Sequence, residues 1–218
     1  MCTRFYIEPE TEELKEIMEA ARRSPLTMRF IRNGDALLTS GEIRPTNVVP
    51  VIAPGRNGQK AVFPMKWGFQ IPGRSLLVDA RAETAKDKPT FKEAWERHRC
   101  IIPSSWYFEW EHLIGSNGQK KTGDKYMIQP VNATVTWLTG LYRIEDGLPY
   151  FTVLTREPSE ELKRIHDRMP VILPESCIGK WIDPDGIPEE VLKESLTEML
   201  AEKTGGREVS MNGTSCIT

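Results

Sequence analysis

The stretch Arg99-Cys100-Ile101-Ile102-Pro103, which leads into Trp106-Tyr107-Phe108-Glu109-Trp110, has the pattern of a buried strand followed by an aromatic one. Further strand candidates lie on both sides of it, at residues 61–69 before it and at residues 125–129, 134–143 and 150–155 after it. Many short strands with few helices predict an α+β fold. We expect a single domain built on a curved, barrel-like, mainly antiparallel β-sheet with peripheral helices.

Helical patterns are confined to a few segments. Residues 11–24 place their apolar side chains on one face, with Thr11 as a cap and Pro25 as a stop. A second amphipathic helix is expected at residues 188–203, and a short one at 160–165. The polar, glycine-rich residues 115–124 predict a loop. Residues 1–203 are therefore expected to form the domain, and residues 204–218 a polar C-terminal tail.

Composition excludes several classes of protein. The 218 residues carry a formal net charge of −2, so any nucleic-acid partner needs a local positive surface. No run of 18 apolar residues exists, which predicts no membrane span, and no secretion signal is apparent. The four cysteines form no CxxC pair and are interpreted as reduced thiols of a cytoplasmic protein. We expect no metal ion, no organic cofactor and a monomer.

Cys2 follows the initiator methionine, and its small side chain favours removal of Met1. The mature chain would then begin with an α-amine and a thiol on adjacent carbons, with unperturbed pKa values of about 8 and about 8.5. The amine can condense with an aldehyde to an imine, and the thiol can then close a thiazolidine ring. The alternative is an ordinary packed thiol near the terminus.

Three further kinds of residue suggest chemistry. Strand alternation places the Glu109 side chain on the opposite face from its aromatic neighbours. A carboxyl group held near apolar surface tends to have a raised pKa, which would suit a general acid or base. The alternative is that Glu109 is an exposed strand residue. His166 is set among reactive residue types, although a helix-end or core histidine fits too. Trp67 and Trp110 could stack on unpaired bases or simply pack in the core. His98 and His112 are expected to face solvent.

Seven short segments follow one another along the chain: Met1-Cys2-Thr3-Arg4-Phe5, Pro45-Thr46 before Val49-Pro50-Val51, Trp67-Gly68-Phe69, Ala80-Arg81-Ala82-Glu83-Thr84, Arg99-Cys100-Ile101-Ile102-Pro103, Glu109-Trp110 and His166-Asp167-Arg168-Met169-Pro170. In these segments and in their order the chain resembles the SRAP family, the SOS-response-associated peptidases or abasic-site processing proteins. The joint order of the segments argues against a coincidental match.

The resemblance implies a DNA-damage function. Such proteins recognise an abasic site in single-stranded DNA and cross-link to its aldehyde through the mature N-terminal cysteine, here Cys2. By resemblance, His166 would assist opening of the sugar ring, and Glu109 would shuttle protons during imine formation. An imine intermediate would also permit an abasic-site lyase side reaction. Phosphates would be bound by Arg4, Arg81 and Arg168, and bases by Trp67 and Trp110. The protein would associate with the nucleoid through DNA.

The sequence departs from the family pattern at three positions. Asp79 stands where the family usually has Asn, and a carboxylate near the N-terminal amine would raise the pKa of the amine and slow its attack. Trp106 stands where a Gly is usual, which predicts a reshaped pocket wall around Glu109. Thr3 also replaces a Gly and adds bulk beside Cys2.

Two other functions remain open at this point. A cysteine peptidase would use the Cys2 thiolate with His166 as base, and removal of Met1 could be its own reaction. A non-covalent single-strand-binding module would leave Cys2 incidental, but such binding requires a basic groove.

Overall fold

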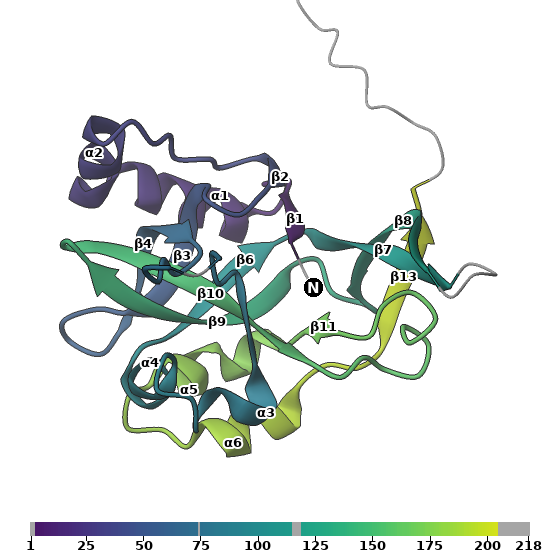
Figure 1. Cartoon of the computed structure of the whole chain (residues 1–218). Coiled ribbons are helices and arrows are strands. Elements are labelled where there is room, and N and C mark those ends of the chain that lie inside the picture. Colours follow the sequence, from purple (N-terminus) through teal and green to yellow (C-terminus); the bar gives the residue numbers. More distant parts are fainter. Residues whose placement is uncertain (1–2, 74, 115–118, 205–218) are drawn as a thin grey trace, which may run out of the picture.

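Five strands close into a barrel at the centre of the computed structural model, which describes residues 3–73, 75–114 and 119–204 (Figure 1). Around the ring, β3 pairs with β4, β4 with β10, β10 with β9, β9 with β6, and β6 again with β3. All of these pairings are antiparallel except β4–β10. The strands of the ring are β3 (Val48–Pro54), β4 (Lys60–Trp67), β6 (Arg99–Ser104), β9 (Thr136–Glu145) and β10 (Leu148–Arg156).

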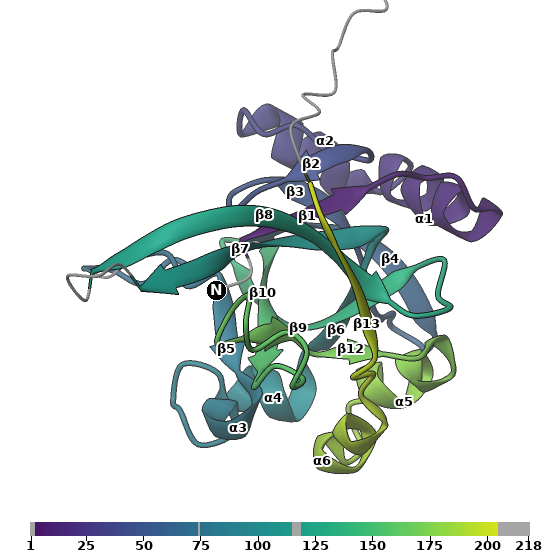
Figure 2. The same ribbon diagram turned by 90° about the vertical axis from the view of Figure 1, so that its right-hand side faces the viewer.

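Short strands extend this barrel, and a second sheet lies beside it. Three short strands pair with the barrel strands β9 and β10: β5 (Asp79–Arg81), β11 (Met169–Pro170) and β12 (Ile172–Leu173). The second sheet has the order β13-β8-β7-β1-β2. Its strands are β1 (Arg4–Ile7), β2 (Gly41–Ile43), β7 (Trp106–Ile114), β8 (Lys120–Pro130) and β13 (Met199–Lys203). Figure 2 shows this sheet arching over one side of the molecule. The predicted α+β domain with a barrel-like, mainly antiparallel sheet is confirmed.

The helices lie outside the sheets, with α1 and α2 on one side and α3 to α6 on the other (Figure 2). They are α1 (Glu12–Arg22), α2 (Pro25–Arg32), α3 (Ala82–Ala85), α4 (Lys92–Arg97), α5 (Ile178–Ile182) and α6 (Pro188–Val191), with 3₁₀ turns at Glu175–Cys177 and Leu192–Glu194. As predicted, the Thr11 hydroxyl accepts a hydrogen bond from the Leu14 N–H at the start of α1. In the described part of the chain, every helix is too short or too polar to span a bilayer.

The helix predicted at residues 188–203 is wrong over most of its length. Helix α6 ends at Val191, and Met199–Lys203 instead forms β13 along the edge of β8. The open edge of β8 supplies a ladder of backbone hydrogen bonds, so the tertiary structure overrides the local helical pattern.

Three smaller expectations also need correction. Pro25 does end α1, but it also opens α2 at the first helical position, where proline is well tolerated. Residues 160–165 form turns rather than a helix. Residues 120–124, expected in a loop, belong to β8, whereas residues 115–118 lie outside the described residues.

Arg99 ties the barrel to the helices that follow β12. Its side chain is buried at the start of β6, with only 1% exposure, and donates hydrogen bonds to backbone carbonyl oxygens rather than to a carboxylate. The acceptors belong to Trp95, Glu96, Trp181, Asp183 and Gly186. The planar five-donor guanidinium can satisfy several carbonyl groups at once, which an ammonium group cannot do in the same geometry.

Replacing Arg99 with lysine should therefore lower the free energy of unfolding by roughly 2–4 kcal/mol, because buried carbonyl groups lose their donors. Urea denaturation would measure the change. Arg97→Lys is the matched control, since Arg97 is largely exposed and its ion pair with Asp185 is long, at 3.9 Å. Equal stability of the two variants would contradict the structural role of the Arg99 hydrogen bonds.

Candidate functional site

A cavity of about 640 Å³ lies where β5, β7 and the segment around His166 meet. It brings together residues that are far apart in the sequence, because β5 lies along β10, and the His112 N–H of β7 donates to the Ile165 carbonyl oxygen. Six residues predicted from the sequence line it: Asp79, Arg81, Glu109, Trp110, His166 and Arg168. Cys2, the predicted nucleophile, lies outside the described residues.

Glu109 is a buried carboxyl group, with 3% exposure, on β7. Alternation along the strand puts it on the same face as the buried Tyr107, away from Phe108 and Trp110. Burial raises the pKa of Glu109 to about 7, and the Asp79 carboxylate adds to the rise. A carboxyl group that titrates near neutral pH can both give and accept a proton.

His166 is also buried, with 6% exposure, and faces Glu109. Its Nε2 lies 3.7 Å from Glu109 Oε2, too far for a direct hydrogen bond. Burial lowers the pKa of His166 to about 4, so the imidazole is neutral at pH 7. Its Nδ1 accepts a hydrogen bond from the Arg168 backbone N–H at 3.0 Å.

His112 is a site residue that the sequence interpretation missed. It is exposed, as expected, but its ring lies 4.0 Å from the His166 ring, centroid to centroid, and lines the cavity. A register shift between Trp110 and His112 brings it there, and such a bulge leaves no clear signal in a single sequence.

His112, His166 and Asp167 each offer a ligand atom within 4.8 Å of the others, so they could hold a metal ion. Asp167 Oδ1 lies 3.0 Å from His166 Nδ1. A metal at that nitrogen would have to displace the hydrogen bond from the Arg168 N–H.

The charged residues that line the cavity differ in the number of ion pairs and hydrogen bonds that they form within the protein. Arg168 forms a bidentate ion pair with Glu83, at 2.9 and 2.8 Å, and also donates to the Thr155 carbonyl oxygen. Arg81 is exposed at the end of β5. Asp79 is partly buried and accepts a hydrogen bond from the Thr155 hydroxyl at 3.3 Å. Lys88, also exposed, adds a cation to the cavity lining that was not predicted.

Three tryptophans take different positions from one another. Trp110 lines the cavity. Trp67 has no exposed surface, lies between the rings of Phe5 and Phe151 and donates to the Val78 carbonyl oxygen, so its predicted stacking on a base is wrong and its role is core packing. Trp106 does not line the cavity. It stacks on Tyr6 on the other face of β7, so the predicted change of the pocket wall around Glu109 is also wrong.

Arg4 pairs in register with Phe108, the neighbour of Glu109. Its guanidinium reaches away from the cavity lining to Glu42 on β2, with Nε 3.2 Å from Oε1. The backbone of Arg4 thus lies beside the strand that carries Glu109, but its side chain places its charge on the outer face of the sheet.

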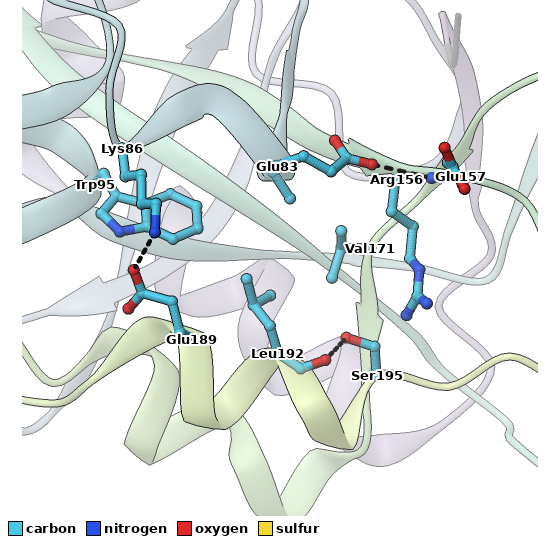
Figure 3. A pocket seen from close by; sticks show the side chains of 10 residues that line it. Glu83, Lys86, Trp95, Arg156, Glu157, Val171, Glu189, Leu192 and Ser195 are labelled. Carbon is cyan, nitrogen blue, oxygen red and sulfur yellow. Dashed lines mark hydrogen bonds and ion pairs between the residues drawn. The ribbon is translucent and has the colours of Figure 1, made fainter.

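Glu83 lines a second cavity, of about 540 Å³ (Figure 3). Its ion-pair partner Arg168 lines the first cavity. The wall of the second cavity is mixed, with Lys86 paired to Glu189 at 3.6 Å and with Arg156 directed into the space. The acidic groups outnumber the basic ones, so this cavity favours a phosphate chain less than the first.

Comparison with known proteins identifies the family of this chain. Residues 1–212 match the family model described as SOS response associated peptidase (SRAP). The chain belongs to the SRAP family.

Several relatives of this SRAP chain are named abasic site processing proteins. The chain is 28% identical to the abasic site processing protein YoqW of Bacillus subtilis, over 96% of this chain and 92% of that protein. YobE of the same organism, also an abasic site processing protein, is 30% identical over 82% of this chain and 86% of its own length. Abasic site processing protein YedK of Escherichia coli is 31% identical over 55% and 54%.

Solved structures support the same fold for the SRAP chain. A phage-related protein of Bordetella bronchiseptica has a TM-score of 0.68 at 21% identity, covering 94% of this chain and 95% of that one. A protein of Bacteroides thetaiotaomicron has a TM-score of 0.66 at 22% identity, covering 93% and 91%.

The two buried titratable groups should leave opposite marks on the pH dependence of stability. Glu109 keeps its proton up to about pH 7 when folded, but only to its ordinary value of 4.5 when unfolded. Stability relative to Glu109→Gln should therefore fall by on the order of 3 kcal/mol from about pH 4 to about pH 8. His166 takes up a proton below 6.5 when unfolded and only near 4 when folded, so stability relative to His166→Gln should rise from about pH 4 to about pH 6.5.

Denaturant unfolding of the three proteins at several pH values would give both differences. Each variant has to be compared with the unmodified protein, because the contributions of Glu109 and His166 to the pH dependence of stability oppose each other there. Two differences with the same sign, or two flat ones, would contradict the assigned protonation states.

Proposed function

We propose that this SRAP protein is an abasic-site sensor that binds single-stranded DNA and forms a covalent thiazolidine cross-link through Cys2. The observation that carries the proposal is the juxtaposition of Glu109 and neutral His166 in one cavity beside β1, the strand that directly follows the N-terminal segment. Cys2 stands two residues before Arg4, which pairs with Phe108 next to Glu109. The names of the relatives support an abasic site as the target.

The reaction begins with a closed sugar. An abasic deoxyribose is mainly a cyclic hemiacetal, and proton transfer through the His166 imidazole would release its aldehyde. The N-terminal amine of mature Cys2 then adds to the aldehyde carbon, giving a carbinolamine. Loss of water from this carbinolamine requires a proton donor to the departing hydroxyl group. Protonated Glu109 can supply that proton because its pKa is about 7.

Ring closure completes the cross-link. The imine carbon is attacked by the Cys2 thiolate, a carbon–sulfur bond forms, and the imine nitrogen takes a proton to become the ring amine of the thiazolidine. The same imine would permit β-elimination of the 3′ phosphate, which accounts for lyase activity as a side reaction. Burial of Glu109 and His166 limits access of water to these steps.

Recognition of the strand would use the exposed part of the cavity. Arg81 and Lys88 offer cations for phosphates, and Trp110 offers an aromatic surface for a neighbouring base. Arg168 is already neutralised by Glu83, so its binding to a phosphate requires that ion pair to open or to be shared. We assign Arg168 a second task, since its backbone N–H orients the His166 ring.

Intact-protein mass spectrometry tests the proposal directly. Mixing the purified protein with a single-stranded oligonucleotide that carries one abasic site should yield a denaturation-resistant adduct of one protein and one oligonucleotide. Cys2→Ala should abolish it, whereas Cys177→Ser is the matched control because Cys177 is a buried thiol away from the cavity lining. Loss of Met1 without any adduct would contradict the proposal.

The family description also names a peptidase, and Cys2 with His166 could act as a nucleophile and base. A thiolate peptidase needs only sulfur, whereas the thiazolidine also needs the amine. Chemical acetylation of the N-terminal amine should therefore abolish the DNA adduct and spare a peptidase. Cleavage of peptides without any cross-linking would favour the peptidase.

Asp79 provides a graded test of the amine chemistry. Replacing it with asparagine removes a negative charge from the cavity and lowers the pKa of a neighbouring amine, so we expect cross-linking to accelerate by roughly threefold to tenfold near neutral pH. Quench-flow or gel assays of adduct formation between about pH 6 and about pH 8 would measure it, with the gain shrinking as pH rises. No gain in this range would exclude the role given to Asp79.

A further inference from the structure

We propose that the outer face of the second sheet binds the single-stranded DNA that flanks the lesion, as an extension of the site. This inference rests on the proposed function. We call this face the outer track. Its residues are Arg4, Tyr6, Glu42, Arg44, Trp106, Phe108, Trp110 and Lys125.

The strand register puts these side chains on one face. Tyr6 pairs with Trp106 on β7 and with Glu42 on β2, and Trp110 pairs with Lys125 on β8. Partners in an antiparallel pair point to the same side, and side chains two residues apart share a face at a spacing of about 7 Å. The alternate residues, including Tyr107 and Glu109, face the interior and are buried. The two faces of β7 thus carry different functions.

Aromatic rings lie along β7 and the neighbouring strand β1 on this face. Tyr6 and Trp106 stack with centroids 4.7 Å apart and planes within 4°. The edge of Phe108 meets Tyr6 at 6.4 Å. Lys125 Nζ lies 3.8 Å from the Phe108 ring centroid and 5.3 Å from that of Trp110. Tyr6, Trp106 and Trp110 are partly exposed, so they offer π surface to a ligand.

The track is positively charged although the whole chain is not. Three cations surround the single carboxylate of Glu42: Arg4 and Arg44 at 3.2 Å and Lys125 at 2.9 Å. The cluster therefore carries a formal charge of +2, against −2 for the chain. Arg44 keeps 61% of its side chain exposed, and Lys125 and Arg4 remain partly accessible. This is the local positive surface that a nucleic-acid partner requires.

Aromatic rings interleaved with cations on a sheet select an unpaired nucleic-acid strand. Bases stack on the rings without regard to sequence, and the cations follow the phosphates. A duplex cannot use the rings in this way, because its bases are stacked on each other. Trp110 belongs both to the cavity lining and to the outer track, so a strand whose lesion occupies the cavity can continue onto the sheet.

Fluorescence anisotropy of undamaged oligodeoxythymidylates of roughly 4 and roughly 16 nucleotides would test whether the outer track binds single-stranded DNA. The longer strand should bind the unmodified protein more tightly. Trp106→Ala should lower affinity for the longer strand about tenfold. Lys125→Gln and Arg44→Gln should each reduce the slope of log affinity against log salt by about 0.7. Lys193→Gln, an exposed lysine on the 3₁₀ turn at Leu192–Glu194, is the matched control and should leave both quantities unchanged.

Two outcomes would overturn the inference. One is that the longer oligonucleotide binds no more tightly than the shorter one. The other is that Trp106→Ala lowers the affinity for duplex DNA as much as the affinity for single-stranded DNA. Thermal unfolding shows whether the Trp106→Ala protein keeps its fold. If it does not, the salt dependence of binding by Lys125→Gln and Arg44→Gln tests the inference instead. Adduct formation on a short abasic oligonucleotide is measured in parallel with the unmodified protein. An adduct without a length effect rejects the outer track alone, whereas a length effect without an adduct rejects the proposed cross-linking alone.

Discussion

Strand β1 is held between β2 and β7, and its register with β7 places Arg4 opposite Phe108. This pairing is the constraint on which the site depends. It fixes the chain two residues after Cys2 beside the strand that carries Glu109. The Phe5 side chain, buried against Trp67 in the core, anchors the strand from below. The chain that follows Cys2 is thus attached to a rigid platform at a defined place.

Burial sets the protonation states that the proposed cross-linking requires. In water a carboxyl group would be ionised at pH 7, and an imidazole would be partly protonated. In this cavity the pKa of Glu109 is raised to about 7 and that of His166 is lowered to about 4, each because burial penalises its charged form. The carboxyl group becomes a proton donor and the imidazole a neutral acceptor or relay. Asp79 strengthens the effect on Glu109.

In the function proposed here, the two faces of β7 separate chemistry from recognition. Glu109 faces inward, where low polarity tunes its pKa, whereas Trp106, Phe108 and Trp110 lie on the opposite face with Lys125. A strand can do this because its side chains alternate every residue. The proposed division also explains how a chain of net charge −2 could bind DNA, since three cations gather around Glu42 and make one face locally positive.

The sequence by itself determined the strand-rich class of fold, a helix within residues 11–24 and six of the residues that line the cavity. Strong local patterns carried those predictions: apolar runs, capping by Thr11 and the ordered blocks from Met1 to Met169-Pro170. Only the tertiary structure decided the rest. Residues 199–203 became a strand because β8 offered an open edge, and Trp67 became core because Phe5 and Phe151 enclose it. His112 joined the site through a bulge, and Arg168 was bound by Glu83, 85 residues away in the chain. Each of these depends on contacts between distant segments, which no local pattern encodes.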